Sequence, residues 1–317
     1  MVSARDTELR ELTADERASY FRAMQGLWGG GLAEEAFVAF QRRLASSPEA
    51  AGRYRMFGLF PRGGADLLSG VKAYDLAGAF EGAPLRILGI GAVFTPPGLR
   101  GRGYAARMLN AALARFGDEG ADAALLFSDI GAEYYRRLGF HALQSAECFA
   151  EGHQLPRSNG YRTAVAADEE PMCRLFELAR GRERLSLSRD GWTLRFQLRR
   201  LRELSRARNL GEPEWGVMVE GASGEAAAMV RLSREAVDVL DAAWTSDGAR
   251  ERLLGGLRDL LARAGRPRLR LWPASQLRGR YAEGPRTGAI AMIAPLRAGV
   301  ALPAADEPAE FSLLDHI

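Results

Sequence analysis

The sequence predicts an α/β (α+β) protein made of two domains, each a mixed sheet with flanking helices. Its 317 residues are 47% hydrophobic and 26% charged, enough for two cores at about 150 residues per domain. Strand and helix patterns alternate in both halves, in the order strand, strand, strand, helix, strand. A polar stretch at residues 154–161 separates the halves. We therefore expect domains over residues 1–152 and 160–317.

The N-terminal segment predicts a short strand followed by two helices. After a strand at residues 8–12, Thr13 is placed to cap a helix, with Glu16 at the third helical position, the spacing of a capping box. The glycines at 29–31 end this helix, and residues 33–44 repeat apolar positions at helical spacing. The glycines form either the hinge of a lid or an exposed turn.

The middle of the first half predicts a meander followed by a strand–helix–strand crossover. The expected strands are 54–60, 67–74, 85–95, 121–127 and 140–149, and the expected helices are 102–116 and 132–138. Gly139 suits the left-handed position after the last helix. The strand at 140–149 is expected to close the first half.

The second half repeats this order, which favours an internal duplication. The expected helices are 169–180, 192–206 and 249–264, and the expected strands are 215–219, 226–232, 236–244, 269–272 and 289–293. The arginine-rich stretch 194–208 is expected to be a solvated helix face with arginine stems over the core. The connection at 245–248 offers Asp247, whose charge would repel a phosphate.

Composition argues against several classes of function. Lys and Arg total 43 against 40 Asp and Glu, and this net charge of +3 is too weak a field to predict nucleic-acid binding. Two cysteines and three histidines build neither a disulfide framework nor a metal site. The N-terminus lacks the apolar core of a signal peptide, and the apolar run 289–296 is too short to span a membrane. We expect a cytoplasmic protein without metal, membrane or nucleic acid.

The most informative motif is the Gly/Arg loop at residues 100–105, which joins a strand to a helix. Backbone N–H groups of such a loop converge in front of the positive end of the helix dipole. Gly101 and Gly103 would let the backbone approach phosphate oxygens, and Arg100 and Arg102 add charge-assisted hydrogen bonds. A plain turn with solvated arginines is the alternative. The loop has neither a Walker lysine nor a full dinucleotide fingerprint, so it predicts a different pyrophosphate ligand.

Two motifs resemble the GCN5-related N-acetyltransferase (GNAT) superfamily. Arg100, Gly103 and Ala105 fill its acetyl-CoA loop pattern Gln/Arg-x-x-Gly-x-Gly/Ala. The segment 135–140 is similar to its Tyr-x-x-x-Gly-Phe pattern. The resemblance implies a GNAT-type sheet, acetyl-CoA as acyl donor, and a second, degenerate GNAT-like domain that lacks the phosphate loop and walls the acceptor pocket.

The resemblance also implies residue roles. The fourth and fifth strands splay apart to admit the pantetheine arm at Val93 and Thr95, and Ser128 lies beside the thioester. The cofactor-binding residues implied are Val93, Thr95, Arg100, Gly101, Arg102, Gly103, Tyr104, Ala105 and Ser128.

The run 126–131, the tyrosine pair and the second domain look like the fungal lysine N6-acetyltransferases and their bacterial relatives. The two-domain plan also resembles the enhanced intracellular survival acetyltransferases. The acceptor so implied is a primary amine of a small molecule, with free lysine or a related amino acid as the leading hypothesis. Alternatives are a protein lysine, a polyamine, an aminoglycoside, or a non-catalytic acyl-CoA sensor.

Acyl transfer to an amine requires a neutral nitrogen, which for an alkylamine costs roughly 4 to 5 kcal/mol at pH 7. A general base relieves part of this cost, and an acid assists the departing thiolate. Tyr135 matches the family position for the acid. Asp129 and Glu133 are the candidate bases or holders of a cationic substrate end.

Each of these residues also has a structural alternative. Asp129 could instead cap the helix at 132–138, Glu133 could be a dipole partner in its first turn, and Tyr135 could be a core aromatic. The C-terminal carboxylate at Ile317 is a further candidate base. His141, Cys148 and Tyr134 are expected to be structural.

Overall fold

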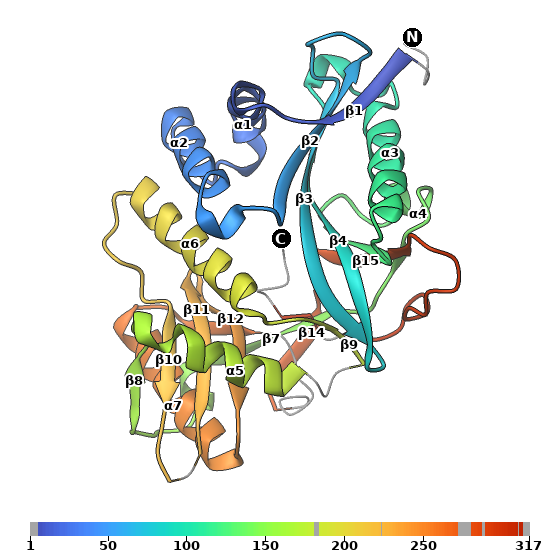
Figure 1. The fold of residues 1–317 in the computed structure, drawn as a ribbon. Helices are drawn as coiled ribbons and strands as arrows, with labels where there is room; N and C mark the ends of the chain where they lie inside the picture. Colours follow the sequence, from blue (N-terminus) through green and yellow to red (C-terminus); the bar gives the residue numbers. More distant parts are fainter. Residues whose placement is uncertain are drawn as a thin grey trace.

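The computed structural model describes residues 6–180, 184–222, 224–271, 280–286, 289–309 and 311–312. Within these residues the chain forms two sheets with helices packed against them (Figure 1). The first sheet has the order β1-β2-β3-β4-β5-β15-β6, with β9 paired to β3, and the second has the order β14-β7-β13-β12-β11-β10-β8. The predicted mixed α/β fold class is confirmed.

The N-terminal segment folds as predicted into β1 (Thr7–Glu11), α1 (Ala14–Trp28) and α2 (Glu34–Ala45). The capping box is present: Thr13 Oγ1 accepts from the Glu16 N–H at 3.3 Å, and Glu16 Oε2 accepts from the Thr13 N–H at 2.9 Å. Hydrogen bonds from Arg10 lower the pKa of Glu16 to about 2. The two helices cover one face of the first sheet beside β2 and β3 (Figure 1).

The predicted meander and crossover are also present. β2 (Tyr54–Pro61), β3 (Ser69–Phe80) and β4 (Ala83–Phe94) pair antiparallel. The helix α3 (Tyr104–Asp118) then returns the chain to β5 (Ala123–Ser128), which is parallel to β4. This arrangement brings the loop before α3 to the same end of the sheet as the C-terminus of β5.

The two sheets exchange strands, which the sequence did not reveal. After α4 (Glu133–Arg136) and β6 (His141–Ala142), β7 (Ala146–Glu151) joins the second sheet beside β13. In return, β15 (Ile290–Pro295) pairs antiparallel with β5 in the first sheet.

The predictions that residues 140–149 close the first half and 289–293 complete the second were therefore wrong. Apolar patterning reports that a strand is buried but not which sheet edge it meets. The division at residues 152–160 stays a prediction, and the sheets themselves cross it.

The second half follows the predicted order of elements. Its elements are β8 (Tyr161–Thr163), α5 (Glu169–Arg180), β9 (Leu185–Leu187), α6 (Gly191–Ala207), β10 (Gly216–Val219), β11 (Ala226–Leu232), β12 (Ala236–Trp244), α7 (Asp247–Arg263), β13 (Arg268–Leu271) and β14 (Ala282–Pro285). As in the first sheet, three antiparallel strands lead through a helix to a strand parallel to the third. β8, β9 and β14 were not predicted, because three or four residues are too few for a clear period.

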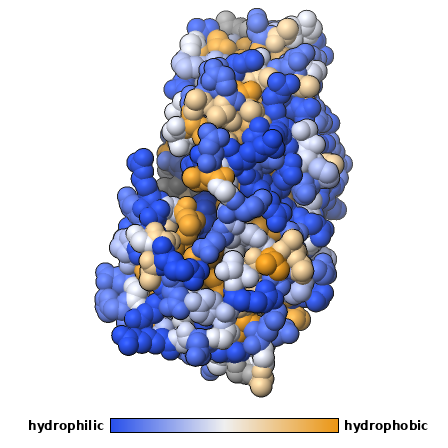
Figure 2. All heavy atoms as spheres, turned by 90° about the vertical axis from the view of Figure 1, so that its left-hand side faces the viewer, coloured by the Kyte–Doolittle hydropathy of each residue, from blue (hydrophilic) through white to orange (hydrophobic). Residues whose placement is uncertain are grey.

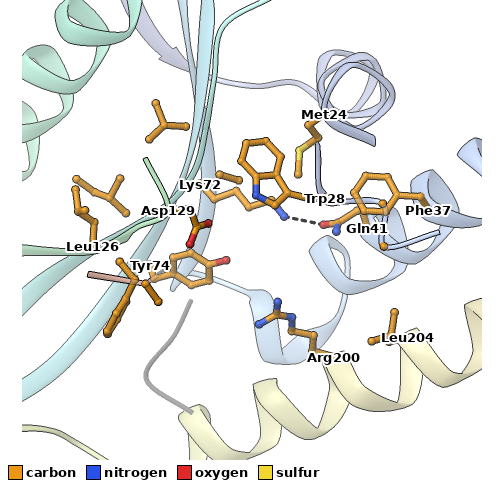
Figure 3. Close-up of a pocket in the computed structure, with 18 of the residues that line it drawn as sticks. Met24, Trp28, Phe37, Gln41, Lys72, Tyr74, Leu126, Asp129, Arg200 and Leu204 are labelled. Atoms are coloured by element: carbon orange, nitrogen blue, oxygen red, sulfur yellow. Dashed lines mark hydrogen bonds between the residues drawn. The ribbon is translucent and has the colours of Figure 1, made fainter. Parts of the chain in front are cut away.

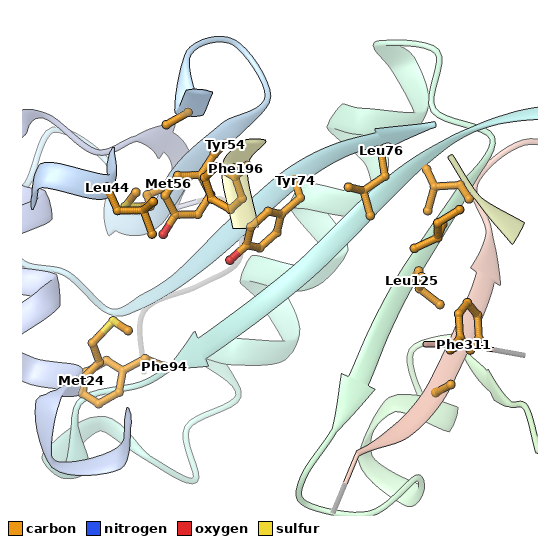
Figure 4. Packing of buried hydrophobic residues seen from close by; sticks show 14 of the residues in the cluster. Met24, Leu44, Tyr54, Met56, Tyr74, Leu76, Phe94, Leu125, Phe196 and Phe311 are labelled. Atoms are coloured by element: carbon orange, nitrogen blue, oxygen red, sulfur yellow. The ribbon is translucent and has the colours of Figure 1, made fainter. Parts of the chain in front are cut away.

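Aromatic packing joins α6 to the first sheet. The ring of Phe196 lies 5.1 Å from Tyr54 and 6.2 Å from Tyr74 (Figure 4). Near the described end of the chain, Phe311 contacts Phe127 of β5 edge to face at 5.4 Å. The contacts of Phe196 fix α6 against β2 and β3.

The face shown in Figure 2 is mostly hydrophilic, with apolar residues in small separate groups. None of the helices in the described ranges has the length and apolar character needed to cross a bilayer.

Candidate active site between the two sheets

A bulge in β4 opens a gap between β4 and β5. The β3–β4 register shifts between Gly70 and Lys72, and Ala92 adopts a positive φ of 47°. The Tyr20 hydroxyl donates to the Ala92 carbonyl at 2.5 Å and supports this conformation. Pairing of β4 with β5 ends at Ile90, so the strands separate beyond that point.

The loop after β4 has the local geometry of an anion site. Gly101 and Gly103 have φ of 75° and 77°, a region that favours glycine, and Gly103 is the N-cap of α3. A Cβ added at either position would meet nothing within 4 Å, so the space over the loop is open. Arg100 and Arg102 are exposed there. The first N–H groups of α3 lack intrahelical partners, and the helix dipole adds positive potential.

The strand end before this loop is held in place. Ser69 Oγ donates to the Phe94 carbonyl at 2.8 Å and lies 3.0 Å from Thr95 Oγ1. Arg100 Nε donates back to the Thr95 carbonyl at 3.2 Å. The predicted roles of Val93, Thr95 and residues 100–105 toward a donor stay predictions, with which this geometry agrees.

A cavity of about 530 Å³ is lined by residues beside the gap and by residues of both sheets, and Figure 3 shows part of this lining. The first half contributes Ala92 and Val93 from β4 and Phe127 from β5. Its other walls come from β3, α1, α2, α4, α6, the second sheet and connecting segments, and include Met24, Trp28, Gly29, Gly30, Phe37, Gln41, Lys72, Tyr74, Asp129, Tyr135, Glu147, Arg200, Leu204, Arg208, Arg231, Arg270 and Arg286. The cavity thus connects the end of β4 with side chains from both halves.

Tyr135 lines this cavity from α4. Its side chain is 8% exposed, and its ring meets Tyr134 at 5.0 Å and Phe140 at 6.0 Å, both edge to face. Burial raises the pKa of the Tyr135 phenol to about 12, so it stays protonated at neutral pH. Gly139, with φ of 89°, ends the turn after α4 as predicted. Tyr135 therefore lines the cavity with a protonated phenol.

Of the two predicted carboxylates, only Asp129 reaches the cavity. Partial burial raises the pKa of Asp129, and nearby Arg286 opposes this shift. Asp129 does not cap a helix, because the N-cap of α4 is Ala132 and has no side-chain hydrogen bond. Glu133 is 69% exposed, pairs with Arg137 at 3.2 Å and does not line the cavity.

Ser128 has a local structural role. Its Oγ donates to the Gly131 carbonyl at 2.6 Å and accepts from the Ile130 N–H at 3.3 Å. These bonds shape the turn that carries Asp129 toward the cavity. Ser128 itself is buried and absent from the described lining.

Lys72 is a cavity residue that sequence reasoning missed. It lies buried on β3 and donates to Gln41 Oε1 at 2.8 Å. Burial, with a smaller contribution from Arg200, lowers its pKa to about 7. The available signal was a lysine between Val71 and Ala73, inside an otherwise apolar strand.

The prediction of a solvated arginine face over residues 194–208 holds for the exposed Arg208 but not for Arg200, which is half-buried in the cavity lining. Arg200, Leu204 and Arg208 follow one another at intervals of four residues and all line the cavity. Figure 3 shows Arg200 reaching from α6 into the cavity, toward Tyr74 and Asp129. The four-residue spacing was visible in the sequence, but the surface opposite it was not.

The remaining candidates are not among the described residues that line the cavity. His141 Nε2 lies 2.8 Å from the Pro303 carbonyl oxygen. Burial raises the pKa of the Cys148 thiol to about 12. No group of three or more His, Cys, Asp or Glu side chains that could hold a metal occurs in the described part of the chain. Ile317, whose carboxylate was a candidate base, lies outside the described residues.

The second half has no equivalent of the Gly/Arg loop before α7. Ser246 Oγ accepts from the Ala249 N–H at 3.1 Å and caps α7. Asp247 pairs with Arg250 at 2.9 Å. This helix terminus is satisfied by its own side chains, in contrast to the open loop before α3.

Comparison with known proteins agrees with this geometry. Residues 8–143 match the family model of the acetyltransferase (GNAT) domain. A GCN5-related N-acetyltransferase from Kribbella flavida superposes with a TM-score of 0.67 at 18% identity, covering 91% of this chain and 70% of its own. No curated protein matches the chain.

Two further solved structures share the fold. Eis1 from Mycobacterium abscessus has a TM-score of 0.57 at 20% identity, covering 92% of this chain and 73% of its own. Saccharomyces cerevisiae N-myristoyltransferase, solved with bound myristoyl-CoA, has a TM-score of 0.55 at 11% identity, covering 92% of this chain and 80% of its own. At these identities the likeness shows the fold alone.

Residues 8–143 are therefore a GNAT acetyltransferase domain. The domain places this chain among the acyltransferases, the enzyme class that the sequence predicted. Acyl-CoA is the donor type of such domains, and an amine is their acceptor type.

Proposed function

We propose that the chain is an N-acetyltransferase that moves the acetyl group of acetyl-CoA directly to the primary amine of a small molecule. The observation that carries this proposal is the single cavity joining the β4–β5 gap to Tyr135 and Asp129. Val93 and Thr95 would hold the pantetheine arm at the gap. Residues 100–105 would hold the pyrophosphate over the open glycine loop.

The residues around the cavity supply the proton transfers. The thioester provides an electrophilic carbonyl carbon; a nitrogen–carbon bond forms there and the carbon–sulfur bond breaks. Asp129 accepts a proton from the amine, directly or through water. Tyr135 donates to the sulfur as it leaves, which its raised pKa permits because the hydroxyl remains protonated.

The proposed acceptor is free lysine or a related amino acid. A cavity of about 530 Å³ suits a molecule of this size. The test is acetyl transfer followed by mass spectrometry over amino acids, polyamines, an aminoglycoside and lysine peptides. Acetylation of a small amine supports the proposal. Acetylation of peptides alone, or CoA binding without any transfer, supports a protein-lysine enzyme or an acyl-CoA sensor instead.

Replacing Asp129 by Asn is expected to lower kcat about 10-fold at neutral pH, because the amine then loses its proton mainly to water. In the wild type, activity should fall as pH drops through the raised pKa of Asp129, since the protonated carboxyl cannot accept a proton. This acidic limb should be weaker in D129N. Steady-state kinetics from pH 5 to 9 measure both effects.

The matched control is Glu133→Gln, which changes a nearby carboxylate that lies outside the cavity. Its kcat should stay within about 2-fold of wild type, as for an exposed pair. An equal loss in E133Q, or an unchanged acidic limb in D129N, would remove Asp129 from the role of base.

A further inference from the structure

The described lining of the cavity is strongly cationic. It contains the five arginines Arg200, Arg208, Arg231, Arg270 and Arg286, and Lys72, which is only partly protonated at neutral pH because its pKa is lowered to about 7. The carboxylates in the same lining are Asp129 and Glu147. Such an excess of positive charge in a concave site attracts anions and repels cations.

Part of this charge is arranged as a ladder across three strands. Arg231 of β11 lies directly opposite Asp238 of β12, which lies directly opposite Arg270 of β13. The Asp238 side chain is 1% exposed and accepts from Arg231 at 2.9 and 3.1 Å and from Arg270 at 3.0 Å. One carboxylate between two guanidinium groups leaves one positive charge in excess.

Arg200 faces this ladder from α6. It is half-buried, and no hydrogen bond or ion pair to its side chain occurs within the ranges that the structure describes. Burial is the main cause that lowers the pKa of Lys72 and the pKa of Arg231. The positive charge of Arg200 lowers both further. Arg231 keeps 39% of its side chain exposed and lines the cavity. The positive charge of Arg200 thus acts on cations of both sheets, Lys72 on β3 and Arg231 on β11.

We propose that the acceptor amine carries an oxyanion, a carboxylate or a phosphate, and that Arg200 and the Arg231–Asp238–Arg270 ladder bind it. Guanidinium groups bind such oxyanions through paired charge-assisted hydrogen bonds. The inference rests on the proposed function and narrows its acceptor class. Amino acids fit, whereas polyamines and aminoglycosides, which carry several positive charges and no anion, are disfavoured.

The two ends of the cavity give the acceptor a direction. Tyr135 and the β4 bulge lie on the side of the first sheet, whereas the ladder belongs to the second sheet. When the oxyanion of the acceptor binds to the ladder, the amine of the same small molecule points toward the β4–β5 gap. Recognition and chemistry are then divided between the two halves of the chain.

The test compares matched amines that differ in the anionic group. The pairs are lysine with cadaverine, β-alanine with propylamine, and phosphoethanolamine with ethanolamine, each assayed with saturating acetyl-CoA. We expect the anionic member of at least one pair to have a kcat/KM about 10-fold or more above its partner. The first two pairs report a carboxylate and the third a phosphate.

Arg200→Gln should reduce that preference about 10-fold while the Kd for CoA stays unchanged. The control is Arg206→Gln, an exposed arginine on the same helix that does not line the cavity, and it should keep the preference. Preference for the partner without an anion in all pairs, or equal behaviour of R200Q and R206Q, would overturn the inference while leaving N-acetyl transfer intact. A weaker CoA affinity in R200Q would also overturn it, because the arginine would then serve the donor.

Isothermal titration of the protein with each of these amines, in the presence of CoA, measures amine binding independently of acetyl transfer. Tighter binding of the anionic members to wild type than to R200Q supports the oxyanion site even if no amine is acetylated, in which case only the proposed function fails. Equal binding of both members of each pair to wild type overturns the site.

Discussion

Gly103→Glu is expected to weaken acetyl-CoA binding at least 100-fold. Gly103 is the N-cap of α3, and its φ of 77° is strained for any residue with a side chain. The new side chain would extend into the open space over the loop and place a negative charge where the pyrophosphate is expected. Calorimetric titration with CoA measures the loss.

Gly52→Glu is the matched control for this variant. Gly52 has φ of 76°, and a Cβ there also meets nothing within 4 Å, but it precedes β2, away from the loop. G52E should show the same backbone strain and an unchanged Kd for CoA. An unchanged Kd in G103E, or the same loss in both variants, would contradict a donor site at residues 100–105.

Tyr135→Phe is expected to lower kcat about 100-fold at unchanged CoA affinity. The substitution keeps the ring packing against Tyr134 and Phe140 and removes only the hydroxyl. The departing thiolate then loses its donor, and general-acid contributions are typically about 10² or more. Pre-steady-state and steady-state acetyl transfer give kcat, and calorimetry gives the Kd.

Tyr134→Phe removes a hydroxyl from the neighbouring residue, which packs on the core and does not line the described cavity. Its kcat should remain within about 2-fold of wild type. If Y135F were as active as Y134F, the acid would have to be another group. If neither wild type nor variant transferred acetyl, the chain would be an acyl-CoA-binding sensor.

Local chemistry made much of the fold predictable. The capping box at Thr13 and Glu16, the period of α3 and the left-handed glycine at 139 each depend on neighbours within a few residues. The Gly/Arg loop was predictable for the same reason. The backbone of this loop has positive φ angles at Gly101 and Gly103, and glycine adopts such angles without strain.

Long-range pairing was not predictable in the same way. A short apolar run does not encode its partner strand, so the pattern could not decide that β7 joins the second sheet and β15 the first. Lys72 and Arg200 were missed for a related reason. A cation in a strand or on a helix becomes part of a site only through the surface that packs opposite it.

The strand exchange explains how a site can be shared by the two halves. β15 pairs with β5, and this pairing brings the segment that carries Arg286 close to the turn that carries Asp129. β7 brings Glu147 to the same cavity. Breaking the chain into two separate domains would cut these strands from their partners.

A single-turnover experiment tests direct acetyl transfer most directly. The protein is loaded with isotope-labelled acetyl-CoA, mixed with the preferred amine, quenched over time and analysed by intact-protein and small-molecule mass spectrometry. Direct transfer predicts that label leaves CoA and appears on the amine nitrogen at the same rate, with the protein unlabelled throughout. Label accumulating on the protein before it reaches the amine, or label that never reaches an amine, would contradict it.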